Sequence, residues 1–167
     1  HWKITLFNEN GHKRIYYTDA YDSIIKATEY DGSNYFVTYY AYNAADELMH
    51  INDTYGNTVI TYTYDLLGRK TQENNIDLGL WQYIYDLEGN LIRQTDNRGL
   101  NISLYYDEID RLVFKNGSSI LNINYTYDLV NGTLGKTTTP TYVMEYYYDA
   151  RLRPISQNRL IDGKNLT

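Results

Sequence analysis

The chain has 167 residues, a formal net charge of −6, no cysteine, and 21 tyrosines against 3 phenylalanines and 2 tryptophans. The acidic balance argues against a nucleic-acid partner, because neutralising phosphates requires a basic surface. The lack of cysteine excludes disulfides and metal–thiolate sites, and no apolar run approaches the roughly 18 residues that a membrane span needs.

The first 40 residues have the composition of strands, and the chain begins at His1 inside such sequence. We therefore expect this to be part of a longer chain or assembly, with its true ends elsewhere. The best helical candidate, Ala44 to His50, is short and falls in phase with the turns that follow it. No sustained helical periodicity occurs elsewhere.

A fixed internal period dominates the sequence. The dipeptide Tyr-Asp, or Tyr-Asn once, recurs every 21 or 22 residues at Tyr21-Asp22, Tyr42-Asn43, Tyr64-Asp65, Tyr85-Asp86, Tyr106-Asp107, Tyr127-Asp128 and Tyr148-Asp149. A period in this range is typical of repeat architectures.

The residues before each dipeptide alternate between apolar and polar, which is the two-residue period of a strand. Four copies place the following residues on one face: Ile60, Tyr62 and Tyr64; Trp81, Tyr83 and Tyr85; Leu121, Ile123, Tyr125 and Tyr127; Tyr142, Met144, Tyr146 and Tyr148. Tyrosine also favours strands.

A turn signal follows each dipeptide. In Asp65 to Gly68 and Asp86 to Gly89 the aspartate can accept a backbone N–H two residues on, and glycine supplies a positive φ. About ten residues later a second turn signal appears, at Asp53 to Gly56, Asp77 to Gly79, Asp96 to Gly99 and Asn116-Gly117. Two strands and two turns fit one period.

The sequence therefore predicts an all-β fold, an array of antiparallel β-hairpins that forms one continuous coiled sheet. We expect residues 1–167 to be a single array of about seven to eight repeats of about 21 residues. The residues that define the structural repeat are Tyr62, Tyr64, Asp65, Gly68, Tyr83, Tyr85, Asp86, Gly89, Tyr106, Asp107, Tyr125, Tyr127, Asp128, Tyr146, Tyr148 and Asp149.

The units beginning at Tyr62 and Tyr83 carry a family resemblance. They read Tyr-Thr-Tyr-Asp-Leu-Leu-Gly-Arg and Tyr-Ile-Tyr-Asp-Leu-Glu-Gly-Asn-Leu, and this pattern resembles the YD repeat of the RHS family. The resemblance covers nearly the whole chain and is best from Asp53 to Leu112. After Asp128 the glycine is shifted by one residue, and no glycine follows Asp149.

The resemblance implies a strip of sheet that coils into the wall of a hollow shell, as in bacterial toxin complexes, polymorphic toxins and teneurins. Such a shell encloses or displays another domain, so the resemblance implies an enclosed cargo, neighbouring repeats or copies as partners through sheet edges, and a secreted or cell-surface location. The paired Asp-Pro motifs of the family's self-cleaving region are missing from this segment.

Catalytic templates are not matched. The chain has no Cys nucleophile, no metal-ligand His pair, no G-x-S-x-G and no phosphate-binding glycine loop, and His1, His12 and His50 are scattered. The recurring aspartates are spaced by two strands, about 9.5 Å, which is too wide for a shared proton or a calcium cage. We expect no enzyme activity, no cofactor and no metal, and a turn-forming role for these aspartates.

Two other functions remain open. One is a self-assembling extracellular tube or filament; the other is a carbohydrate-binding surface module, in which Trp81 and exposed tyrosines bind a cell-surface glycan. Known choline- and carbohydrate-binding repeats contain Gly-Trp and Tyr-Tyr-Phe units, which are missing here. N-glycosylation triplets begin at Asn52, Asn101, Asn116, Asn124, Asn131 and Asn165, although a turn-rich repeat with many Asn and Thr also produces such triplets by accident.

Overall fold

The computed structural model describes residues 2–117, 122–161 and 164–166, and these residues form strands, turns and no helix. The prediction of an all-β fold built from antiparallel hairpins is confirmed. The chain divides into two compact units, His1–Gln82 and Tyr83–Thr167. In the described part of the chain, no helix is long and apolar enough to cross a membrane.

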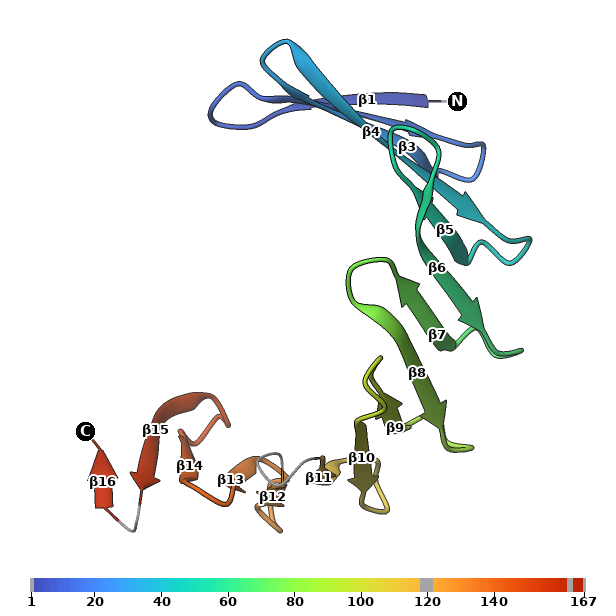
Figure 1. Ribbon diagram of the computed structural model, residues 1–167. Coiled ribbons are helices and arrows are strands. Elements are labelled where there is room, and N and C mark those ends of the chain that lie inside the picture. The colour runs from blue at the N-terminus through green and yellow to red at the C-terminus, as the bar shows by residue number, and fades with distance from the viewer. Residues whose placement is uncertain (1, 118–121, 162–163, 167) are drawn as a thin grey trace. The chain divides into compact units, whose positions relative to one another are not determined.

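The first unit is a run of antiparallel strands in which each strand pairs with the next along the chain (Figure 1). Its strands are β1 (Trp2–Phe7), β2 (Lys13–Thr18), β3 (Ile24–Asp31), β4 (Asn34–Tyr42), β5 (Leu48–Asn52), β6 (Thr58–Tyr64), β7 (Lys70–Asn75) and β8 (Gly79–Tyr85), the last of which extends past the unit boundary. Ala44 to His50 is not helical, because it forms a turn and the start of β5.

The second unit is also a meander, in which each strand from β9 to β16 is antiparallel to the next. Its strands are β9 (Leu91–Thr95), β10 (Asn101–Tyr106), β11 (Leu112–Asn116), β12 (Ile123–Tyr127), β13 (Leu134–Thr138), β14 (Val143–Tyr148), β15 (Pro154–Ile161) and β16 (Lys164–Leu166). Leu121, assigned above to the tyrosine-bearing face, lies outside the described residues.

Neither unit has a thick hydrophobic core, because each is a single layer of sheet. Among the described residues, the apolar side chains that are buried are Ile15, Ala27 and Val37, and all three belong to strands β2 to β4 of the first unit. The predicted tyrosines are half-buried on one face, as β8 shows by its strict alternation of half-buried and exposed positions. Stability therefore depends on contacts between adjacent strands, as expected for a linear array.

A β-bulge precedes the turns that begin at Asp65, Asp107, Asp128 and Asp149. The strand register shifts by one residue at Thr63/Tyr64, Tyr105/Tyr106, Thr126/Tyr127 and Tyr147/Tyr148, so the tyrosine of each dipeptide is the last residue paired before the turn. A bulge bends its strand and increases the local twist. This bend directs the chain into the turn with the aspartate at its first position.

The assignment of Tyr21-Asp22 as the first in-phase dipeptide is wrong. The register of β2 and β3 pairs Thr18 with Ile24, as it pairs Tyr42 with Leu48 in the next hairpin, so Thr18-Asp19 takes the dipeptide's place. Asp19 Oδ1 accepts hydrogen bonds from the amides of Tyr21 and Ser23. Asp19 and Asp22 lie three residues apart, and the sequence pattern indicated Asp22 because it follows a tyrosine.

Candidate functional site

The turn that begins at Asp65 shows how the motif works. Asp65 Oδ1 accepts hydrogen bonds from the backbone amides of Leu67 (2.9 Å) and Arg69 (3.0 Å). The backbone closes the turn, because Gly68 N–H donates to the Asp65 carbonyl and Asp65 N–H donates to the Arg69 carbonyl. One carboxylate oxygen thus satisfies two amides that the turn would leave without a partner.

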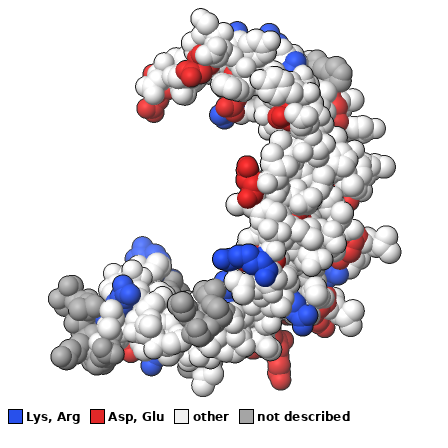
Figure 2. Space-filling view, in the orientation of Figure 1, with Lys and Arg blue, Asp and Glu red and all other residues white. Residues whose placement is uncertain are grey.

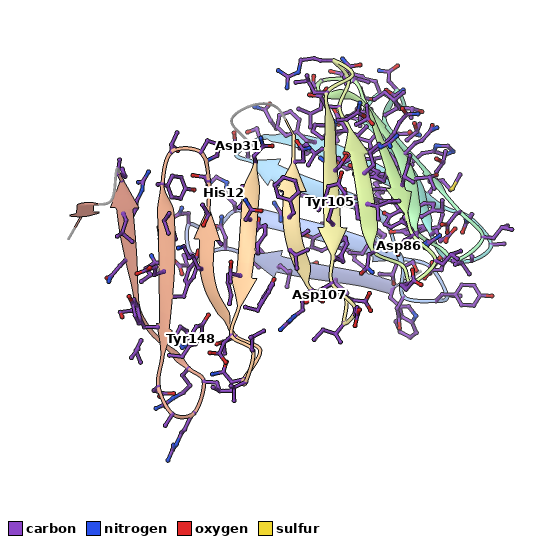
Figure 3. The ribbon with its side chains drawn as sticks, turned by 90° about the horizontal axis from the view of Figure 1, so that it is seen from below. His12, Asp31, Asp86, Tyr105, Asp107 and Tyr148 are labelled. Atoms are coloured by element: carbon purple, nitrogen blue, oxygen red, sulfur yellow. The ribbon has the colours of Figure 1, made fainter. Side chains whose placement is uncertain are left out.

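The same turn recurs along one edge of the second unit, where Asp86, Asp107 and Tyr148 lie in Figure 3. Asp107 and Asp149 each accept from the amides two and four residues later, and Asp86 accepts from the amide of Asn90. At Asp128 the turn is one residue longer, because Gly132 N–H donates to the Asp128 carbonyl across four residues. The shifted glycine of this repeat therefore reflects a longer turn.

The fourth position of the turn requires a positive φ. Gly68 and Gly89 meet this requirement with φ values of 77° and 99°. Elsewhere the position is filled by residues with a side chain, Asp46 (φ 62°), Asp110 (φ 61°) and Leu152 (φ 60°). Aspartate tolerates this region better than leucine does, so Leu152 is held in an unfavourable conformation by the hydrogen bonds around it.

Arginine at the fifth position adds an ion pair to the turn. Arg69 Nε lies 2.7 Å from Asp65 Oδ2, and Arg111 and Arg153 pair in the same way with Asp107 and Asp149. The hydrogen bond from the Arg69 amide holds the pKa of Asp65 below its ordinary value, and the Arg69 side chain lowers it further. These carboxylates are ionised and fully engaged at neutral pH.

In five of the dipeptides the tyrosine ties one hairpin to the preceding strand. Tyr64 OH donates to the carbonyl of Leu48, the first residue of β5, at 2.8 Å. The same bond joins Tyr42 to Ile24, Tyr106 to Leu91, Tyr127 to Leu112 and Tyr148 to Leu134, at 2.9–3.0 Å. Burial raises the pKa of the Tyr64 and Tyr106 hydroxyls, so both are neutral donors at physiological pH.

The tyrosines two positions earlier line the same face of the sheet. Lys70 Nζ lies 5.3 Å from the Tyr62 ring centroid, within the range of a cation–π contact. Burial raises the pKa of Tyr125, and the hydroxyl of Tyr146 lies 3.4 Å from Thr137 Oγ1. Tyr83 and Tyr85 are half-buried in β8.

Neighbouring turns also contact each other directly. Ser23 Oγ donates to Asp46 Oδ1 (2.7 Å) in the first unit, and Asn90 Nδ2 donates to Asp110 Oδ1 (2.7 Å) in the second. In both cases the fifth residue of one turn reaches the fourth residue of the next. Neither these bonds nor the tyrosine ties were predicted from the sequence, although polar residues at both turn positions in successive repeats were a usable signal.

Among the described residues, no group of three or more His, Asp or Glu side chains could hold a metal ion. His12 lies in the turn between β1 and β2, and His50 is exposed in β5 (Figure 3 labels His12). His1 lies outside the described residues. Charged side chains of both signs are scattered over the face in Figure 2. The absence of enzyme activity stays a prediction.

Trp81 does not form an open platform for a sugar. It is half-buried on the tyrosine-bearing face of β8, opposite Glu73 of β7, and its indole Nε1 is buried. A hollow of about 580 Å³ in the first unit lies instead among Leu6, Arg14, Glu29 and Phe36. Arg14 and Glu29 form an ion pair of 2.7 Å in its lining.

The glycosylation triplets differ in their surroundings. Thr54 of the Asn52 triplet is engaged in structure, because its Oγ1 accepts from the Val37 amide (2.7 Å) and donates to the Val37 carbonyl (3.0 Å). Asn131 is exposed at a turn, and its Oδ1 accepts from both the amide and the hydroxyl of Thr133.

The remaining triplets lie in or beside strands. Asn101 and Asn124 are exposed in β10 and β12, Asn116 ends β11 next to undescribed residues, and the side chain of Asn165 lies outside the described part of the chain. Glycosylation of all six therefore stays a prediction.

No family model matches the chain, and no curated protein matches its sequence. Solved structures do match it. The TcdB2–TccC3–Cdc42 crystal structure matches with a TM-score of 0.69 and 15% identity over 93% of this chain and 9% of that chain. The Tc holotoxin pore of Photorhabdus luminescens matches with a TM-score of 0.71 and 15% identity over 95% of this chain and 10% of that one.

The TcdB2–TccC3 crystal structure gives the same result, with a TM-score of 0.71 and 15% identity over 98% of this chain and 11% of that chain. The likeness is one of fold. This chain thus spans about a tenth of the length of the toxin-complex chains that it resembles.

Proposed function

We propose that this chain is a wall segment of a large RHS/YD-repeat protein and that its role is architectural. The observation that carries the proposal is the fold match to Tc toxin complexes over 93–98% of the chain at TM-scores of 0.69–0.71. The motif residues quoted for the YD resemblance coincide with the turn aspartates and hairpin-tying tyrosines. This coincidence supports a YD repeat as the structural unit.

The geometry also supports the absence of catalysis. Each turn carboxylate that pairs with arginine uses one oxygen for backbone amides and the other for the guanidinium. Each tyrosine hydroxyl that ties two strands donates its only proton to a carbonyl. The carboxylates of these aspartates and the hydroxyls of these tyrosines are therefore occupied by structural hydrogen bonds and ion pairs. A hydrolytic activity lost on His50→Ala or Asp107→Ala, in protein that remains folded, would contradict this part of the proposal.

In the proposal the wall belongs to a hollow shell of a secreted or cell-surface protein, and the shell encloses or displays another domain. Support comes from the neighbours, which are components of toxin complexes and about ten times longer than this chain. A short array of hairpins buries little surface by itself, so it gains stability by joining further repeats.

Electron microscopy of the native particle that carries this segment tests the proposal, at a resolution that resolves the strands. The expected result is a closed β-shell with separate density in its lumen. An open tube or filament that repeats every 167 residues would overturn the shell and favour the self-assembling alternative.

A further inference from the structure

A hollow of about 570 Å³ lies on the tyrosine-bearing face of the second unit, over strands β13 to β15 (Figure 1). Strand pairing puts Thr137, Met144 and Arg159 of its lining in one row. Thr137 is buried at the base of the hollow, whereas Arg159 is exposed. The volume is in the usual range of small-molecule sites. The residues that line the hollow are Thr137, Tyr142, Met144, Tyr146, Gln157 and Arg159.

Arg159 is the sole charged side chain on this face of β12 to β15. The only other charged residues of these strands are Lys136 and Glu145, which are opposite each other on the other face. Asp149 lies five residues beyond Met144, roughly 17 Å along the strand direction, and pairs with Arg153. Within the described residues, the Arg159 side chain forms no ion pair.

The contact that holds Arg159 leaves its hydrogen-bond donors available. Arg159 Cζ lies 4.6 Å from the centroid of the Tyr142 ring, within the range of a cation–π contact. Such a contact engages the charge of a guanidinium but none of its N–H donors. No hydrogen bond from this side chain occurs in the part of the chain that the structure describes. The amide of Gln157 supplies further donors in the same hollow.

These donors suit a carboxylate better than a phosphate. A guanidinium binds a carboxylate through two parallel N–H···O bonds, and its single positive charge balances the single negative charge of that group. A phosphate dianion would keep one charge uncompensated, because no second cation lies on this face of β12 to β15. The chemistry of the hollow therefore favours a monoanion.

The other side chains of the hollow suit a flat apolar group. The thioether of Met144 and the ring of Tyr146 make favourable contacts with an aromatic ring. Tyr146 OH lies 3.4 Å from Thr137 Oγ1, so these two hydroxyls are already partnered with each other. Polar recognition is thus concentrated at Arg159 and Gln157, on the exposed side of the hollow.

We propose that this hollow binds a small aromatic carboxylate. The carboxylate accepts hydrogen bonds from Arg159 and Gln157, and the ring packs against Met144 and Tyr146. The site goes beyond the proposed wall function, because the strand pairing and turn bonds that build the wall do not use the Arg159 side chain.

An NMR titration of the isotope-labelled 167-residue chain with phenylacetate tests the proposal. The expected result is saturable binding with a dissociation constant on the order of 1 mM. Amide shifts should be concentrated at residues 137, 142–146 and 157–159. Phenylacetamide, which lacks the charge, and acetate, which lacks the ring, should each bind at least about tenfold more weakly.

Substitution of Arg159 separates charge from geometry. Arg159→Gln should weaken phenylacetate binding at least about tenfold, whereas Arg159→Lys keeps the charge without the planar donors and should weaken it about threefold to tenfold. Arg98→Gln is the matched control, because Arg98 is an exposed arginine of the same unit that already pairs with Asp96. It should leave binding unchanged, and the dispersion of the amide signals checks that each variant is folded.

Three results would overturn the proposal. They are no saturation of the native chain by about 20 mM phenylacetate, binding of phenylacetamide or acetate within about twofold of phenylacetate, and binding by Arg159→Gln within about twofold of the native chain. Each of them leaves the shell test intact, because that test concerns the native particle.

Discussion

The turns at Asp65 and Asp149 share their hydrogen bonds and their arginine ion pair, yet they differ at the position of positive φ. Gly68 occupies it in the first turn (φ 77°) and Leu152 in the second (φ 60°). A glycine pays no steric cost there, whereas leucine does. The aspartate therefore defines this turn, and glycine only relaxes it.

Removing the aspartate should have the largest effect, and the two turns should respond differently. Asp65→Ala should lower the urea midpoint more than Asp149→Ala does, because loss of the Asp149 cap lets Leu152 leave its unfavourable conformation and the Asp65–Arg69 ion pair is less exposed. Both aspartate variants should lower the urea midpoint more than replacement of a hairpin-tying tyrosine by phenylalanine does. Asn at either position keeps the Oδ1 acceptor and is the control. Equal losses at the two sites would show that the conformation of Leu152 does not depend on the cap.

Removing the tyrosine hydroxyl should have the next largest effect, and here the two turns should agree. Tyr64→Phe and Tyr148→Phe each leave a backbone carbonyl without its donor, at a cost of about 1 kcal/mol in the free energy of unfolding. Urea denaturation measures both. Tyr147→Phe is the control, since that hydroxyl donates to Glu145 on an exposed part of the strand.

Exchanging the residues of positive φ should give smaller effects of opposite sign. Leu152→Gly should stabilise by about 0.5–1 kcal/mol, because relief of strain exceeds the added chain entropy of glycine. Gly68→Ala should destabilise by about 1 kcal/mol, and its Cβ would also lie 2.9 Å from Glu47 Oε1. A stability loss on Leu152→Gly would mean that packing of the leucine outweighs its backbone strain.

Lowering the pH should produce the most gradual loss of stability. The pKa values of Asp65, Asp107 and Asp149 are lowered in the folded state, first by backbone amides and then by arginine. Their contribution to the stability of the folded state is therefore complete above the unfolded-state pKa of about 4. It is lost as the pH falls through the lower pKa values of the folded state. Unfolding midpoints measured from pH 6 to pH 2 should fall only below about pH 4. The Asp65→Asn variant should show a shallower fall.

The period and the alternation were sufficient to predict the all-β hairpin array. Tyr62 and Tyr64 lie on one half-buried face of β6, and Tyr83 and Tyr85 on one half-buried face of β8, as a two-residue period requires. The aspartates form turns because their side chains act within four residues, and such local chemistry can be read from a sequence.

The contacts between repeats could not be predicted from the sequence. A tyrosine hydroxyl reaches a carbonyl 14 to 18 residues earlier, and that pairing depends on a bulge whose position the pattern does not specify. The register at Asp19 was missed for a related reason, because two aspartates three residues apart compete for one cap and only strand pairing decides between them.

The turn after Asp128 is one residue longer than the others, yet the next dipeptide still follows 21 residues after Tyr127. The strands cannot absorb such a change, since a slip of one residue would move every side chain to the opposite face. The opposite turn compensates for it, because residues 139–142 separate β13 from β14, whereas the longer segment 96–100 separates β9 from β10. Insertions in related chains should therefore accumulate at the turn tips, which makes them the natural positions for grafting a short peptide or a labelling tag into the array.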